Sequence, residues 1–182
     1  MNFRRVFLIM CVTLAILSSL TMVTAGWFDF GGNPQDIGGI TFNIPGDYKE
    51  ISQLDGNNLE FDFKNMKDVE TKYYGYNHSD GTTIKPNQLI ISVISDSGVK
   101  LDDISKFTYG ENEKVDMDDF NETTIADKTG YAFDTEPHET VGGHMSPEYH
   151  EFFYVVDGKL VYVGLWGWSP YVSSDMIADI IG

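Results

Sequence analysis

Alternating apolar and polar positions dominate the chain, and this pattern predicts a protein built mainly from β-strands. The segment LEFDF at 59–63 alternates strictly, which places its large side chains on one face, as in a half-buried strand. VETKYYGY at 69–76 and QLIISVIS at 88–95 are rich in β-branched and aromatic residues, and the turn-rich stretch between them predicts a hairpin. Further strands are predicted at 40–45 and, as a pair, at 122–133.

Two segments follow a helical pattern instead. LDDISKF at 101–107 spaces its apolar residues three apart and predicts a short helix. SSDMIADIIG at 173–182 begins with serine and carries an apolar stripe, which predicts a C-terminal helix. Strands outnumber helices and no strand–helix–strand unit repeats, so the predicted fold class is α+β. We expect an antiparallel sheet flanked by a few helices, with the C-terminal helix packed on it.

The best-defined element is the hairpin EFFYVVDGKLVYVGLW at 151–166. Its Asp157-Gly158 pair lies between two apolar runs and is typical of a two-residue turn with positive φ at both positions. This turn fixes the facing pairs as Val156–Lys159, Tyr154–Val161, Phe152–Val163 and His150–Leu165. One face is then mostly aliphatic and includes His150. The opposite face carries four aromatic residues: Tyr149, Phe153, Tyr162 and Trp166.

Residues 1–25 have the pattern of an export leader. A basic start is followed by an uncharged apolar run of 18 residues, Val6 to Val23. The small residues up to Ala25 predict signal cleavage after Ala25. Because about 18 apolar residues also span a bilayer, an uncleaved membrane anchor is the alternative. Both alternatives predict a protein that is secreted or tethered to the outer face of the cytoplasmic membrane.

The rest of the chain divides into two parts. The Gly-rich stretch at 26–39 predicts a linker, and 40–182 predicts a single domain. Cys11, the only cysteine, falls in the leader, which excludes thiol catalysis and thiolate metal sites in the domain. Without the leader, ten lysines face 28 acidic residues and no arginine remains. A surface this acidic repels nucleic acid and anionic lipid, so we expect no nucleic-acid partner.

The order of these elements resembles the PsbP-like superfamily, named for an extrinsic photosystem II subunit. It is also similar to exported archaeal and bacterial proteins of unknown function. The resemblance rests on ITFNIPGDY (40–48), TTIADKTGYAF (123–133), FYVVDGKLVYV (153–163) and the closing helix. It implies an antiparallel sheet flanked by helices. It implies no catalytic residue, because the group shares no active-site motif.

The stretch PHETVGGHMSPEYH at 137–150 holds three of the four histidines, which are candidate metal ligands: His138, His144 and His150. Its HETVGGH is not the HExxH motif, because the two imidazoles are six apart and two glycines interrupt a helix. His138 and His144 are therefore expected in a loop and His150 at the start of a strand. A loop that folds back onto the strand would bring the three nitrogens together on zinc or copper.

Three other sets of residues are candidates for binding or modification. The aromatic hairpin face (Tyr149, Phe153, Tyr162, Trp166) is either part of the core or a stacking platform for sugars or a docking patch for protein. Acidic residues at 115–122 form either a solvated loop or a calcium site. Two N-glycosylation sequons begin at Asn77 and Asn121 in predicted turns.

These observations favour a non-catalytic domain over an enzyme. The sequence contains no nucleophile elbow and no phosphate-binding glycine loop. We therefore predict no catalytic residues and no cofactor, and an exported binding or structural domain of unknown ligand at the outer cell surface. A cell-surface protein and a carbohydrate are its candidate partners. The alternative is a metal-binding protein or metal-dependent hydrolase that uses the histidines at 138–150.

Overall fold

The computed structural model describes residues 32–182, apart from 55–60, 64–65, 80–83, 97, 110–112, 140–142, 144 and 169–170. The predicted leader lies outside the described residues. Among the described residues, none of the helices combines the length and the hydrophobicity that a bilayer crossing requires.

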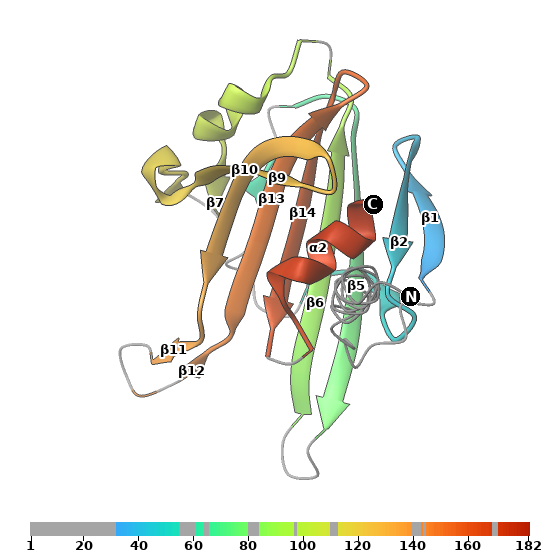
Figure 1. The fold of residues 1–182 in the computed structure, drawn as a ribbon, viewed down its shortest axis with the longest axis vertical. Coiled ribbons are helices and arrows are strands. Elements are labelled where there is room, and N and C mark those ends of the chain that lie inside the picture. The colour runs from blue at the N-terminus through green and yellow to red at the C-terminus, as the bar shows by residue number, and fades with distance from the viewer. Residues whose placement is uncertain are drawn as a thin grey trace, which may run out of the picture. The chain divides into compact units, whose positions relative to one another are not determined.

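A seven-stranded antiparallel sheet forms the centre of the fold (Figure 1). From edge to edge its strands are β3 (Lys49–Ile51), β5 (Val69–Ser79), β6 (Ile84–Ile94), β14 (Lys159–Gly167), β13 (Glu148–Val156), β10 (Lys128–Thr135) and β9 (Asn121–Ile125). The long strands β6, β14 and β13 lie in the middle and are buried over most of their length, as expected for apolar, β-branched segments.

The predicted hairpin is confirmed in its turn and its register. Asp157 and Gly158 both have positive φ, at 51° and 74°. The four facing pairs predicted from the turn are those observed, from Val156–Lys159 to His150–Leu165. The two-residue turn determines which residues face each other across the hairpin. The apolar pattern adds to this, because a slip by one residue would move every apolar side chain to the opposite face of the sheet.

The fold is mainly β with little helix, so the prediction of an antiparallel sheet flanked by a few helices is confirmed in its sheet and its C-terminal helix. In the described part of the chain, α2 (Ser174–Ile181) is the one α-helix, and it packs on the sheet as predicted. The segment expected to be a helix at 101–107 forms the 3₁₀-helix η1 (Leu101–Lys106), and a second one is η2 (Met117–Asp119). Apolar residues three apart suit the three residues per turn of a 3₁₀-helix.

One face of the sheet is covered by α2 and by the hairpin of β1 (Asn33–Ile37) and β2 (Ile40–Ile44) (Figure 1). Gly38 and Gly39 form its turn with φ of 57° and 77°. The Gly38 amide donates to Glu70 Oε2 at 2.9 Å, and Lys159 Nζ donates to the Gly38 carbonyl at 2.6 Å. The second half of the predicted linker is therefore folded, because its apolar Ile37 is fully buried against the sheet.

The two faces of the sheet carry separate cores. The helix-side core lies under α2 and the β1–β2 hairpin, and its largest members are Phe42, Tyr48, Tyr74, Phe152 and Tyr154. The far-side core lies under η1 and the segment around η2, and its largest members are Phe107, Phe120, Phe153, Tyr162 and Trp166. Three two-residue strands complete a small sheet of order β4 (Phe61–Asp62), β7 (Thr108–Tyr109), β8 (Glu113–Lys114). A separate pair is β11 (His138–Glu139) and β12 (Met145–Ser146).

Candidate functional site

The helix-side face becomes polar where β13 begins. Because side chains alternate along a strand, Glu148 and His150 project to the same face as the core residue Phe152. His150 is the register partner of Asp134 on β10, and Glu148 is that of Gly167 on β14. The strand pairing thus brings two carboxylates to one imidazole.

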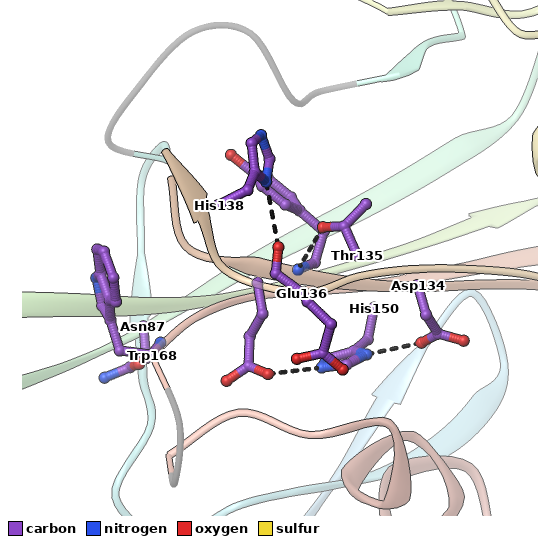
Figure 2. A network of polar contacts seen from close by, with 9 residues as sticks. Asn87, Asp134, Thr135, Glu136, His138, His150 and Trp168 are labelled. Atoms are coloured by element: carbon purple, nitrogen blue, oxygen red, sulfur yellow. Dashed lines mark hydrogen bonds and ion pairs between the residues drawn. The ribbon is translucent and has the colours of Figure 1, made fainter. Parts of the chain in front are cut away.

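The imidazole of His150 lies between these carboxylates. Its Nδ1 is 2.7 Å from Asp134 Oδ1, and its Nε2 is 3.5 Å from Glu148 Oε2 (Figure 2). His150 and Glu148 are 8% and 6% exposed, whereas the Asp134 side chain is 54% exposed. Asp134 therefore connects a buried histidine to solvent.

The Asp134 contact decides where the proton of a neutral imidazole lies. A carboxylate oxygen accepts, so His150 Nδ1 carries the hydrogen and Nε2 keeps a free lone pair. Nε2 and the second oxygen of Glu148, Oε1, are both buried without a hydrogen-bond partner among the described residues. Buried polar atoms are almost always paired, and in the described part of the chain the Tyr48 hydroxyl is the other exception beside these two atoms.

The charges around His150 also affect its protonation. Burial lowers the pKa of His150, but the hydrogen bond and charge of Asp134, together with the charge of Glu148, outweigh it. The pKa of His150 therefore lies above its ordinary value. In the absence of another ligand, the site favours an imidazolium between two carboxylates.

Asn87 on β6 extends this polar region across β14. A side chain at Gly167 would collide with the Asn87 amide and with Val172, so glycine leaves the room that Asn87 occupies. Asn87 and Trp168 lie side by side (Figure 2), and Asn87 Oδ1 accepts from the Trp168 amide at 2.9 Å. Asn87 Nδ2 donates to the Tyr76 carbonyl at 3.3 Å. These bonds fasten the chain after β14 to the sheet.

A second region is a pocket of about 280 Å³ at the β3 edge of the sheet, where β3 begins at Lys49 while β5 continues past Gly75. Its lining residues are Asp47, Lys49, Ile51, Gly75, Tyr76, Asn77, Pro86, Asn87 and Gln88. A Cβ on Gly75 would lie 3.2 Å from Ile51 Cδ1, so the missing side chain contributes to the hollow.

The pocket combines donors and acceptors of both charges. Asp47 supplies a carboxylate, Lys49 an ammonium, and Asn77 an exposed amide. Lys49 Nζ already donates to the Gly46 carbonyl at 3.2 Å, which holds it at the rim. Such a lining suits a small, polar and uncharged molecule better than an ion.

The structure separates the histidines proposed as metal ligands. His150 lies in the buried network, whereas His138 is exposed on β11 with its Nδ1 3.1 Å from the Glu136 carbonyl. Figure 2 shows the two imidazoles directed toward different partners. His144 lies outside the described residues, so the convergence of all three stays a prediction. Within the described ranges, no three His, Cys, Asp or Glu side chains form a group that could hold a metal ion.

The aromatic hairpin face belongs to the far-side core. Phe153, Tyr162 and Trp166 are 0%, 1% and 6% exposed, and the rings of Phe153 and Tyr162 stack with centroids 4.7 Å apart. Tyr149 is half-buried beside Trp166. These rings fill the space under η1 rather than present an open platform. Of the two alternatives predicted for this face, the structure therefore has the core.

The remaining candidates lie on exposed strands and turns. Asn77 and Asn121 are exposed, but Asn77 is within β5 and Asn121 begins β9, whereas turns were predicted for both. In the acidic segment, Asp116 Oδ1 accepts from the Asp118 amide at 3.0 Å and so caps η2. That carboxylate has a local structural role, which accounts for its position without calcium.

Sequence reasoning did not single out Glu148 or Asp134. The Glu148-x-His150 spacing in a strand was a usable signal, because residues two apart share a face. Asp134 had no such signal, since no tight turn joins β10 to β13 and the register between them depends on tertiary packing.

Comparisons with known proteins give no relative. No protein-family model, no curated protein and no solved structure matches the chain.

Proposed function

We propose that the chain is an exported, non-catalytic binding domain and that its ligand is a small carbohydrate held in the pocket at the β3 edge. The proposal keeps the localisation expected from residues 1–25: secreted, or tethered to the outer face of the cytoplasmic membrane. It also keeps the PsbP-like α+β resemblance as an interpretation of the element order. The observation that carries the proposal is the pocket between β3, β5 and β6.

The chemistry of the pocket supports a sugar over other small molecules. Sugar hydroxyls both donate and accept hydrogen bonds, and the lining offers a carboxylate, an ammonium and amides within one hollow. The Tyr76 ring lies 6.0 Å from the Tyr48 ring and 5.9 Å from the Tyr171 ring, so aromatic surface lies next to the polar groups. The volume of about 280 Å³ lies just below the range of about 300–1,000 Å³ that is usual for small-molecule pockets, so the proposed ligand is a small sugar.

The test is ligand-detected NMR with a panel of glucose, galactose, mannose and N-acetylglucosamine. We expect at least one sugar to show saturation transfer from the protein, and Gly75→Val to abolish it by filling the pocket. Thr124→Val on the exposed edge strand β9 is the matched control and should bind as the parent does. Absence of binding by the whole panel, or unchanged binding in Gly75→Val, contradicts the proposal.

Export has its own test. N-terminal sequencing of the protein made in its native host should find a chain that begins at Gly26 if the leader is cleaved. An intact N-terminus with protease-accessible residues after 26 would indicate the anchored form. A chain protected from protease in intact cells would contradict export in either form.

A further inference from the structure

We propose that His150 and Glu148 form a binding site for a divalent transition-metal ion, with zinc as its probe and Asp134 as the outer partner that orients the imidazole. This site differs from the predicted three-histidine cluster, because it uses a carboxylate of β13 itself and neither His138 nor His144. It is also separate from the carbohydrate pocket, and neither proposal depends on the other.

The distance between the two donor atoms fits a shared ion. Zinc bonds to nitrogen and oxygen of about 2.0–2.2 Å at a tetrahedral angle place two ligand atoms about 3.4 Å apart. His150 Nε2 and Glu148 Oε2 are 3.5 Å apart. With His150 protonated this separation is that of an ion pair, and with a neutral imidazole it suits two ligands of one ion.

The orientation of His150 is that of a metal ligand. A metal-bound imidazole ordinarily donates its other N–H to a carboxylate, which fixes the tautomer and makes the free nitrogen more basic. Asp134 is that carboxylate, at 2.7 Å from Nδ1. The opposite nitrogen, Nε2, is buried with no hydrogen-bond partner in the described part of the chain, as is Glu148 Oε1.

Charge gives an independent reason for a cation here. Glu148 is 6% exposed, and its only ion-pair partner in the described part of the chain is His150. A protonated His150 balances only one of the two carboxylates, whereas a divalent ion bound to a neutral His150 would balance both Glu148 and Asp134. Mixed nitrogen and oxygen ligands favour ions such as zinc, copper or nickel over calcium and magnesium, which take oxygen ligands.

With two protein ligands, the ion keeps open positions for water or another small ligand. Structural zinc sites are filled by four protein ligands, and catalytic ones commonly have three. We therefore expect saturable binding of one equivalent that is reversed by a chelator, rather than an ion on which the fold depends. The domain should remain folded after treatment with EDTA.

The experiment is calorimetric titration of the tag-free, EDTA-treated protein with Zn²⁺, together with the visible spectrum after addition of Co²⁺. We expect one equivalent to bind, and His150→Gln and Glu148→Gln each to abolish it. Asp134→Asn should weaken binding by about 10–100-fold, as loss of an outer-shell carboxylate does. The matched control, His138→Gln on exposed β11, should bind as the parent does.

Three results would overturn the proposal. The first is no saturable binding, in which case His150 binds only a proton. The second is unchanged binding in either His150→Gln or Glu148→Gln, when circular dichroism shows that the variant is folded. The third is loss of binding in His138→Gln, which would move the site to the β11–β12 connection.

Discussion

On its helix-side face, β13 carries two neighbouring pairs of buried side chains that are built differently. Toward the turn, Phe152 and Tyr154 are 0% and 1% exposed and stack on each other with ring centroids 5.4 Å apart. At the start of the strand, His150 and Glu148 are 8% and 6% exposed, yet two of their polar atoms have no hydrogen-bond partner among the described residues. The side chains toward the turn pack as in an ordinary protein core, whereas those at the start of the strand leave buried polar atoms without hydrogen bonds.

This difference indicates that the two parts of β13 have different roles, one in the stability of the fold and the other in binding. Apolar packing lowers the free energy of the folded state, so the turn end explains why the sheet is stable. Buried, unpartnered polar atoms raise it, and natural proteins keep such departures mainly at functional sites. The start of β13 is therefore the better place to look for binding, and substitutions at the two ends should give opposite combinations of effects.

The largest expected effect on stability is at the turn end. Phe152→Ala leaves a cavity in the helix-side core beside Tyr154 and Val163. It should lower the free energy of unfolding by about 3–5 kcal/mol, measured by urea denaturation. The folded fraction should still bind one equivalent of Zn²⁺. A loss below about 1 kcal/mol would mean that this end is not the packed core described above.

A smaller loss is expected at the start of the strand. His150→Phe keeps the volume of an aromatic side chain but leaves the Glu148 carboxylate buried without its cationic neighbour. In metal-free protein it should lower the free energy of unfolding by about 1–3 kcal/mol, the cost of an unsatisfied buried group. Combined with Glu148→Leu, the loss should largely disappear, because apolar replacement of both partners is often neutral. If the double variant were less stable than His150→Phe, the loss could not be assigned to a buried Glu148 carboxylate without a partner.

The pH dependence of stability is a subtler test of the same end. Since the pKa of His150 is raised in the folded protein, protonation of His150 stabilises the fold. In metal-free protein this contribution should be fully present below the unfolded value of about 6.5 and should be lost as pH rises through the higher folded pKa. Urea denaturation across this pH range, compared with His150→Gln, measures it. A stability difference between the two proteins that grows with rising pH would contradict the assignment.

The smallest effect is expected at the exposed histidine of the same connection. His138→Gln removes an exposed ring on a surface strand, where its Nδ1 lies 3.1 Å from the Glu136 carbonyl. The free energy of unfolding should change by no more than about 0.5 kcal/mol. A larger change would show that β11 and β12 contribute to the stability of the sheet. His138 would then resemble His150 in its effect on the free energy of unfolding.

Sequence patterns predicted the parts of the fold that local chemistry determines. The Asp157-Gly158 turn and strict alternation defined the β13–β14 register, and the apolar stripe of Met176, Ile177, Ile180 and Ile181 defined the packed face of α2. The strand at Asn33–Ile37 was missed, because Gly38 and Gly39 were interpreted as linker residues when they form its tight turn.

The candidate sites were harder to predict, because their residues come together through tertiary packing. Asp134 and His150 are 16 positions apart and meet only through the β10–β13 register. The pocket depends on where β3 begins beside β5, and its only local signal is a glycine within a strand, Gly75. Neither a pocket beside an edge strand nor a contact between residues of neighbouring strands can be predicted from the sequence of one segment.

The most direct test of the metal site is a crystal structure of the protein soaked with Zn²⁺, with anomalous scattering measured at the zinc edge. We predict a peak about 2.0–2.2 Å from His150 Nε2 and from a Glu148 carboxylate oxygen, with the Nδ1–Asp134 hydrogen bond retained. A site with no anomalous peak between these two residues, or a peak on His138 alone, would contradict it.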